Sequence, residues 1–217
     1  MSNFIKTVLI VGLGSIGRRH IGVIKNLFPK INIVVLRHKR CDKNNIKELG
    51  LYKCVTSINK AIATNPQAAI IANPATKHVE VAKQLASNRV NLLIEKPISD
   101  SSKGVEELID ICIKNNVTLM TGYNLRFLPS LIEFKRQLQE NKIGNIYSIR
   151  SEIGQYLPSW RPESDYRSSV SANKSLGGGA LLELSHEIDY LSWVFGSIKW
   201  VKSHVSRQSS LEINVED

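Results

Sequence analysis

The clearest candidate for chemistry in this 217-residue sequence is the glycine-rich loop Gly12-Leu13-Gly14-Ser15-Ile16-Gly17. A loop of this spacing between a strand and a helix is typical of pyrophosphate binding. The first glycine permits a tight turn, the second admits the phosphates, and the third lets the helix pack closely on the strand. The helix N-terminus adds N–H groups and a partial positive charge. We therefore predict dinucleotide binding through Gly12, Gly14, Ser15, Ile16 and Gly17; the alternatives are a bare glycine turn or a methyltransferase-type loop.

The choice of dinucleotide depends on the residues after the second expected strand. NAD-binding proteins usually place an Asp or Glu there to accept hydrogen bonds from the ribose 2′-hydroxyl. This sequence has Arg37 and His38 at that point, and the next carboxylate is Asp42. A guanidinium pairs well with a 2′-phosphate, so Arg37 favours NADP over NAD, with His38 beside it in the cofactor site. Alternatively, Arg37 and Arg40 are solvated surface charges and either cofactor is accepted.

The hydrophobic pattern predicts the elements that position this loop. Short β-branched runs alternate with segments of helical spacing, which is typical of an α/β fold with a doubly wound parallel sheet. Such sheets bind ligands at the carboxyl ends of their strands. Strands are expected at 7–11, 31–36, 68–71, 90–94 and 117–120, and helices at 16–27, 77–87 and 102–114. We expect Thr76 to cap the second of these helices, and Ser99, Asp100 or Ser101 to cap the third.

The pattern changes after Gly122, where we place a domain boundary between residues 1–122 and 123–217. The second part reads as an incomplete α+β domain with an open sheet. Its expected elements are helices at 127–140 and 180–195 and strands at 146–153, 198–206 and 211–215. A polar, aromatic stretch occupies 155–176.

Composition narrows the function classes. The sequence contains no run of about 18 apolar residues, so we expect no membrane span. The apolar stretch 8–14 leads into a glycine loop rather than a signal-peptide cleavage site, so we expect a cytoplasmic protein. The net charge of +10 lies entirely in residues 1–60, which hold 12 Lys/Arg against Asp42 and Glu48. A local excess favours a polyanionic ligand or a solvated face. Nucleic-acid binding is disfavoured because aromatic residues are scarce there.

The three cysteines are Cys41, Cys54 and Cys112. Their spacing fits neither a metal site nor a disulfide framework. We therefore expect reduced, structural thiols and no metal site.

Five motifs occur in a characteristic order along the chain. They are Gly12–Gly17 followed by Arg18-Arg19-His20, then Asn73-Pro74-Ala75-Thr76-Lys77-His78, Glu95-Lys96-Pro97, Gly122-Tyr123-Asn124-Leu125-Arg126-Phe127, and Gly177-Gly178-Gly179 before Glu183-Leu184-Ser185-His186-Glu187-Ile188-Asp189. The set resembles the glucose–fructose oxidoreductase, inositol dehydrogenase and MocA family over essentially the whole chain. The resemblance implies a Rossmann domain and a second domain whose open sheet often mediates oligomers. It also implies hydride transfer between NAD(P) and a hydroxyl or keto carbon of a sugar, polyol or nucleotide sugar.

The resemblance assigns the catalytic lysine to Lys96, often joined to its proline by a cis bond. It implies that Asn73, Pro74, Thr76 and His78 line the nicotinamide ribose side, and that Glu95 orients Lys96 or the cofactor. Hydride leaves a carbinol carbon only as the hydroxyl proton departs, so an acid/base group must be near. A partly desolvated lysine can fill this role and stabilise a developing alkoxide. The alternative is an exposed charge at a strand end.

The resemblance also implies a substrate site in the second domain. Relatives often carry a carboxylate four residues before a histidine; here Glu183 precedes His186 by three, and Asp189 follows by three. On one helix these share a face, so His186 is a candidate for proton transfer and Glu183 and Asp189 for substrate binding, the alternative being a packed or solvated histidine. Tyr123, Asn124 and Arg126 at the domain junction are further substrate candidates.

The stretch 160–167 resembles a loop of relatives linked to bacterial surface-polysaccharide synthesis. Its Trp160 and Arg161 are candidates to hold an acidic or nucleotide-linked sugar, or belong to a surface loop. Relatives are typically longer, so we expect a truncated second domain. A catalytically incomplete dinucleotide-binding protein is therefore an alternative to the enzyme, and a relative that uses its cofactor for hydrolysis is another.

Overall fold

The computed structural model describes residues 5–39, 41 and 43–217. The chain divides into two compact units, Met1–Gly122 and Tyr123–Asp217. Arg40 and Asp42, which entered the argument about the cofactor, lie outside the described residues. Within the described part of the chain, no helix has the length and apolar character needed to cross a membrane.

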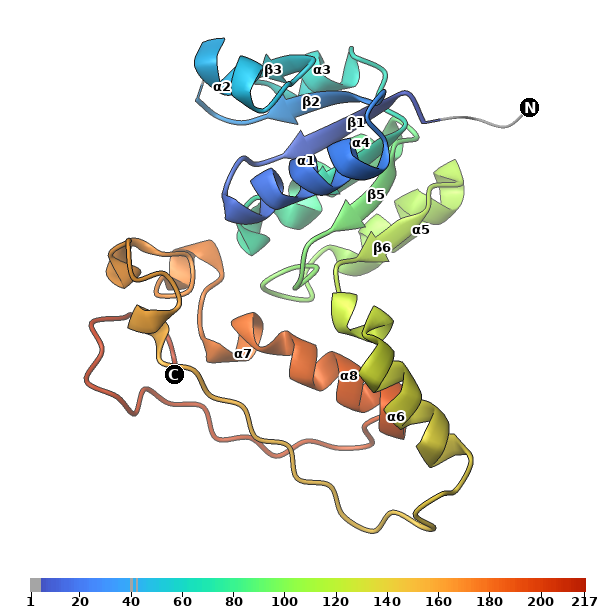
Figure 1. Ribbon diagram of the computed structural model, residues 1–217, viewed down its shortest axis with the longest axis vertical. Coiled ribbons are helices and arrows are strands. Elements are labelled where there is room, and N and C mark those ends of the chain that lie inside the picture. Colours follow the sequence, from blue (N-terminus) through green and yellow to red (C-terminus); the bar gives the residue numbers. More distant parts are fainter. Residues whose placement is uncertain (1–4, 40, 42) are drawn as a thin grey trace. The chain divides into compact units, whose positions relative to one another are not determined.

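The first unit contains a six-stranded sheet in the order β3-β2-β1-β4-β5-β6 (Figure 1). All five strand pairs are parallel. The order reverses between β1 and β4, which makes their carboxyl ends the topological switch point of a Rossmann fold. This confirms the predicted α/β class, although the three-residue β3 was not predicted. The strands are β1 Thr7–Val11, β2 Asn32–Leu36, β3 Lys53–Val55, β4 Ala68–Ile71, β5 Asn91–Ile94 and β6 Leu119–Thr121.

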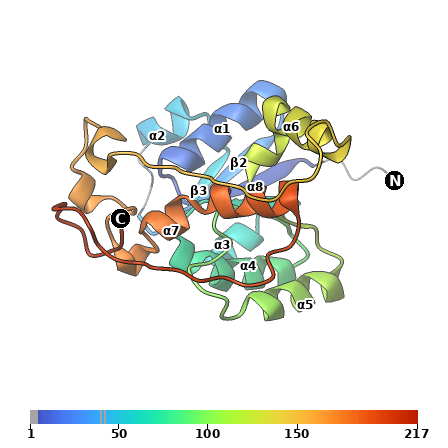
Figure 2. The ribbon, with the colours of Figure 1, turned by 90° about the horizontal axis from the view of Figure 1, so that it is seen from below.

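Helices cover both faces of this sheet (Figure 2). Successive strand residues point to opposite faces, so Val8 and Ile10 join a buried cluster with Ile21 of α1. Leu9 and Val11 join another cluster with Leu85 of α4. Burial on both faces explains why β1 is an uninterrupted apolar run. The helices are α1 Ser15–Leu27, α2 Lys43–Glu48, α3 Ile58–Ile62, α4 His78–Ser87 and α5 Val105–Asn115.

Two predicted helix caps are wrong. Thr76 lies inside a 3-10 turn, η1 Ala75–Lys77, and α4 follows directly without a side-chain cap. The N-cap of α5 is Gly104, which has the left-handed φ of 76°. Ser99 instead uses its hydroxyl to accept the N–H of Ser101 at 3.3 Å. Before α5, a side chain predicted to cap the helix therefore forms its hydrogen bond within the preceding turn.

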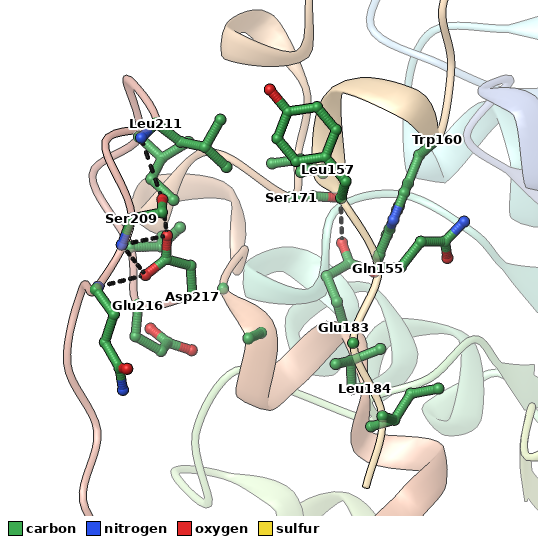
Figure 3. A pocket seen from close by; sticks show the side chains of 18 residues that line it. Gln155, Leu157, Trp160, Ser171, Glu183, Leu184, Ser209, Leu211, Glu216 and Asp217 are labelled. Carbon is green, nitrogen blue, oxygen red and sulfur yellow. Dashed lines mark hydrogen bonds between the residues drawn. The ribbon is translucent and has the colours of Figure 1, made fainter.

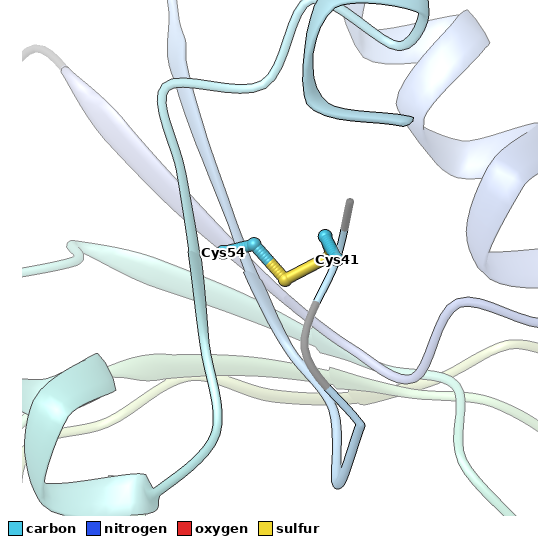
Figure 4. The surroundings of a disulfide bond; sticks show 2 residues. All are labelled: Cys41 and Cys54. Carbon is cyan, nitrogen blue, oxygen red and sulfur yellow. A yellow bond between two sulfur atoms is a disulfide. The ribbon is translucent and has the colours of Figure 1, made fainter. Parts of the chain in front are cut away.

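The expectation of three reduced thiols is also wrong, because Cys41 and Cys54 form a disulfide (Figure 4). The bond joins the segment after β2 to β3, with 6.1 Å between the two Cα atoms. Cys54 is brought into reach because β3 pairs with β2, where Cys54 lies opposite Val35. Spacing along the chain does not reveal such a contact. Cys112 is the remaining cysteine, free and buried.

The second unit consists mainly of helices and turns. The predicted helix at 127–140 begins later, since Pro129 occupies the first turn of α6 Pro129–Gln139. The predicted helix at 180–195 is interrupted at Leu184, which separates α7 Ala180–Glu183 from α8 Ser185–Phe195. Four 3-10 turns complete the unit: η2 Asn124–Phe127, η3 Leu157–Ser159, η4 Tyr166–Ser168 and η5 Lys174–Leu176.

The strands predicted at 146–153, 198–206 and 211–215 are not formed, and the described residues of 123–217 contain no strand. Alternating apolar residues make a strand only where a neighbouring strand takes up the backbone hydrogen bonds. The first two segments have no such neighbour and leave Tyr147 92% and Trp200 80% exposed. In the third, Ile213 and Val215 instead pack with Ala172 in a small core.

Candidate functional site

The predicted site motifs of the first unit follow the carboxyl ends of adjacent strands. Gly12 follows β1 and donates its N–H to Leu36 O of β2 at 2.9 Å. Glu95 follows β5 and Gly122 follows β6, and their N–H groups bond to the preceding strands at 2.9 and 2.7 Å. The parallel register therefore brings motifs from residues 12 to 122 to one edge of the sheet, beside the switch point.

The glycine loop has the form that a bound pyrophosphate requires. Gly12 has a φ of 96°, and a Cβ there would lie 2.7 Å from Ala72 O. A Cβ on Gly17 would lie 2.4 Å from Gly12 O, so the helix packs at a distance that only glycine allows. At Gly14, by contrast, a Cβ would meet nothing within 4 Å. The loop is closed on its protein side and open at Gly14, which fits a dinucleotide phosphate cradle.

The start of α1 supports the same ligand. Gly14 is its N-cap and supplies no side-chain hydrogen bond, and the first turn contains no acidic residue. N–H groups of this turn, including those of Ser15 and Ile16, can therefore meet a phosphate. Arg37 follows β2 at the same edge and is half-buried, held by its N–H to Val55 O at 3.1 Å, and His38 is exposed.

His78 does not line the site as the sequence predicted. Its side chain is only 1% exposed, so a ligand has no access to it. The ring contacts two backbone oxygens, Asn73 O at 2.7 Å and Pro97 O at 3.0 Å. Burial lowers the pKa of His78, although both carbonyls act to raise it. His78 therefore braces the loops after β4 and β5 rather than contacting a cofactor.

Three other candidates of the Asn73–His78 motif remain partly accessible. Asn73, Pro74 and Thr76 are half-buried. The side-chain oxygen of Asn73 is itself buried and has no hydrogen-bond partner. A buried polar atom of this kind needs a partner, which a ribose hydroxyl or carboxamide could supply.

Lys96 follows Glu95 and precedes a cis peptide bond to Pro97. The Lys96 N–H donates to Glu95 Oε2 at 3.3 Å. Glu95 Oε1 is 2.6 Å from His20 Nε2 on α1. Sequence reasoning quoted His20 in a motif but gave it no role. The two residues lie 75 positions apart in the chain. The signal in the sequence that could have indicated a role for His20 is its place directly after the glycine loop, in the motif Arg18-Arg19-His20.

In the second unit, the junction residues contact α8. The ring of Tyr123 meets His186 edge-on, with 5.6 Å between the ring centroids. Arg126 donates from Nε and Nη2 to the Asp189 carboxylate at 2.9 and 2.7 Å, and this contact raises the pKa of Arg126. Arg126 and Asp189 therefore pair with each other, and their predicted contacts with a substrate stay predictions. Asn124 is exposed.

A cavity of about 400 Å³ lies within the second unit (Figure 3). Trp160 and Glu183 line it, as do Leu157 and Leu184. Glu183 Oε1 accepts a hydrogen bond from Ser171 Oγ at 2.9 Å, a partner that the sequence did not predict. The Trp160 indole N–H is buried without a hydrogen-bond partner.

The break at Leu184 alters the predicted catalytic face. Glu183 ends α7 and lines the cavity, whereas Asp189 lies on α8 and pairs with Arg126. Glu183, His186 and Asp189 therefore do not lie on one continuous helix, since His186 and Asp189 belong to α8 and Glu183 to α7. Arg161 is exposed. Among the residues that the structure describes, no group of three His, Cys, Asp or Glu is arranged to hold a metal ion.

Comparison with known proteins yields two family matches. The model described as an oxidoreductase family with an NAD-binding Rossmann fold matches residues 6–123. The GFO/IDH/MocA C-terminal domain model matches residues 131–217. The rhizopine catabolism protein MocA of Rhizobium meliloti is 23% identical over 188 residues, covering 86% of this chain and 56% of its own length. Trans-1,2-dihydrobenzene-1,2-diol dehydrogenase of Xenopus tropicalis is 33% identical over 119 residues, or 54% of this chain and 34% of its own length.

Solved structures share the fold. The WlbA dehydrogenase from Bordetella pertussis, in complex with NADH and UDP-GlcNAcA, has a TM-score of 0.82 at 20% identity and covers all of this chain and 62% of its own. Scyllo-inositol dehydrogenase from Lactobacillus casei, with NAD(H) and scyllo-inositol, has a TM-score of 0.72 at 23% identity, covering 88% and 56%. The chain spans about a third to just over half of the curated relatives named above. With a glycine cradle at the switch point and both domain models matched in order, the chain belongs to the Gfo/Idh/MocA oxidoreductase family.

Proposed function

We propose that this chain is an NAD(P)-dependent oxidoreductase that transfers hydride between nicotinamide and a hydroxyl or keto carbon of a sugar, polyol or nucleotide sugar. The observation that carries the proposal is the position of Lys96 on the same sheet edge as the glycine cradle. Relatives solved with a nicotinamide cofactor and a sugar-like molecule support the same class.

The residues of the first unit would hold the cofactor in a defined direction. Gly12, Gly14 and Gly17, with the start of α1, would bind the pyrophosphate, and Arg37 and His38 the adenosine ribose. Asn73, Pro74, Thr76 and Glu95 would serve the nicotinamide end. The bound nicotinamide supplies the hydride donor or acceptor.

Lys96 would handle the proton. Its ammonium can donate a hydrogen bond to the substrate oxygen and transfer a proton as a ketone is reduced. In the oxidation direction, the amine takes the hydroxyl proton. The positive charge also stabilises an alkoxide that develops on the substrate.

The finer assignments are proposals as well. Arg37 supports NADP as the preferred cofactor because a guanidinium pairs with a 2′-phosphate. In the second unit, His186 is our candidate for proton transfer and substrate contact. Trp160 and Glu183 are proposed to hold a hydroxylated ring, since both line the cavity and the indole N–H awaits an acceptor. Tyr123, Asn124 and Arg161 remain candidates for substrate binding. We also propose that the protein is cytoplasmic and assembles into a homo-oligomer.

The first experiment is titration of the purified protein with NADPH and NADH, followed by nicotinamide fluorescence. We expect binding of both and tighter binding of NADPH. Gly14→Val should abolish binding while the protein stays folded, because a side chain at Gly14 meets only open space in the loop. Gly22→Ala, also in open space but on α1 outside the loop, is the matched control.

Arg37→Asp separates the cofactors. It should weaken NADPH binding at least about tenfold, a loss near 1.4 kcal/mol, and leave NADH binding unchanged. Tighter binding of NADH by the wild-type protein would refute the NADP assignment alone.

Turnover then distinguishes an enzyme from a cofactor-binding protein. Sugars, polyols and nucleotide sugars would be screened with Lys96→Ala as the inactive control. Cofactor binding without turnover of any substrate would support the catalytically incomplete dinucleotide-binding protein. Failure of a folded chain to bind either cofactor would refute the proposed function.

A further inference from the structure

His20 is a polar residue of the first unit that contacts a candidate site residue but has no part in the proposed mechanism. It lies on α1, and its Nε2 is 2.6 Å from Glu95 Oε1 after β5. The side chains are 21% and 16% exposed, respectively. The contact joins two motifs that lie 75 positions apart, and its partners are less exposed than those of a surface ion pair.

The Glu95 carboxylate is held from several sides. Oε1 meets His20, and Oε2 accepts the Lys96 N–H at 3.3 Å. Gly122 closes a third side, since a Cβ there would lie 3.1 Å from Oε2. The imidazole therefore holds the carboxylate on one side and the Lys96 backbone holds it on the other.

The charges at this contact define the donor. Burial acts to raise the pKa of Glu95, but the hydrogen bond and charge of His20 and the contacts of Lys96 outweigh it, so the pKa lies below its ordinary value. Glu95 is thus ionised at neutral pH and only accepts hydrogen bonds. His20 must then donate its Nε2–H. Two further titratable groups interact electrostatically with Glu95: the Lys96 ammonium and His78 on α4, whose pKa burial lowers.

We propose that His20 is a positioning residue for the reaction: its imidazole orients Glu95, and through Glu95 the backbone of Lys96. The inference rests on the proposed function, in which Lys96 meets substrate. His20 itself touches neither substrate nor reacting atoms. Its removal should leave the lysine in place chemically but poorly held.

The test compares His20→Ala, His20→Gln and Glu95→Gln with wild-type protein, with exposed His204→Gln as the matched control. The first measurement is the carbon-13 titration of the Glu95 carboxyl without cofactor. In His20→Ala the Glu95 pKa should rise, because burial remains and the hydrogen bond is gone. In His20→Gln the Glu95 pKa should rise less, because the glutamine amide can donate a hydrogen bond to the carboxylate.

The second measurement is steady-state kinetics across pH. A misplaced catalytic group costs about 10- to 100-fold, and we expect His20→Ala to lose this in kcat with little change in cofactor KM. The loss should grow as pH falls and Glu95 protonates. His20→Gln should recover most of it, and His20→Ala added to Glu95→Gln should cost nothing more.

The outcomes separate the two proposals. An unchanged Glu95 titration in His20→Ala would overturn the inference whatever the activity, and so would an unchanged kcat. The Glu95 titration could shift in His20→Ala while the folded wild-type protein binds neither NADPH nor NADH. This result would refute the proposed function, and the contact would then only support the structure. A wild-type protein that binds cofactor but turns over no substrate would also refute the positioning role.

Discussion

The two units of this chain form their structure by different means. In the first, the largest fully buried side chains of the described residues come from the sheet and the helices that cover it. The second unit consists of helices and turns, and its buried hydrophobic cluster is the small set Ala172, Ile213 and Val215. Its extended segments leave large apolar side chains exposed, Trp200 and Tyr147 among them. Apolar pattern therefore becomes a strand only where another strand is available to pair with it.

The dependence of the first unit on close packing is tested most severely at Gly17. Gly17→Val places carbon against Gly12 O, a backbone atom that cannot move without disrupting β1 and the loop. We expect a loss of about 3 kcal/mol or more in the free energy of unfolding. Thermal unfolding measures it, with Gly22→Ala as control, expected to stabilise by roughly 0.5–1 kcal/mol. Equal stability of the two variants would contradict the packing at Gly17.

The disulfide of the first unit gives the next effect. It closes a loop of sequence separation 13, for which chain entropy predicts about 3 kcal/mol. Dithiothreitol should lower the urea midpoint of the wild-type protein by the corresponding amount. Cys41→Ser should begin at the reduced value and not respond to the reagent. A midpoint that is the same with and without reductant would show that the thiols are not bonded in solution.

His78 makes the stability of the first unit depend on pH. Because burial depresses its pKa below the ordinary 6.5, its contribution is complete above that pH and is lost as the pH falls through the folded-state value. In urea unfolding experiments, the free energy of unfolding of the wild-type protein should therefore decline from pH 8 to pH 5. The decline should be smaller in His78→Gln. His204→Gln, at an exposed position, should leave the slope as it is. An identical slope in all three proteins would place the titrating group elsewhere.

The smallest effect is expected in the second unit. Trp200→Ala removes a side chain that is 80% exposed, so the free energy of unfolding should change by less than about 0.5 kcal/mol. Leu9→Ala, at a position with no exposure, should cost about 3–5 kcal/mol. A large loss at Trp200 would mean that this segment is covered in solution, and the contrast between the units would fail.

Sequence predicted the parallel sheet of the first unit, and the strand ends that carry its motifs, because the signals for these elements are local. Each of these signals lies within a few neighbouring residues. They are the glycines of the loop, the apolar run of β1, and Glu95-Lys96 at the end of β5. The helices at 127–140 and 180–195 were less accurate, since Pro129 delays one and the break at Leu184 divides the other. That break alone revised how Glu183 and Asp189 share a face.

By itself, the sequence determined the parallel sheet, the glycine loop between β1 and α1, and the order of the motifs, because periodicity and glycine placement act over short distances. Tertiary structure alone decided the contact of His20 with Glu95, the bond between Cys41 and Cys54, and the pairing of Arg126 with Asp189. It also decided that His78 is a buried brace and that the segments around Tyr147 and Trp200 stay unpaired. Each of these depends on which distant residues become neighbours, and no local pattern carries that information.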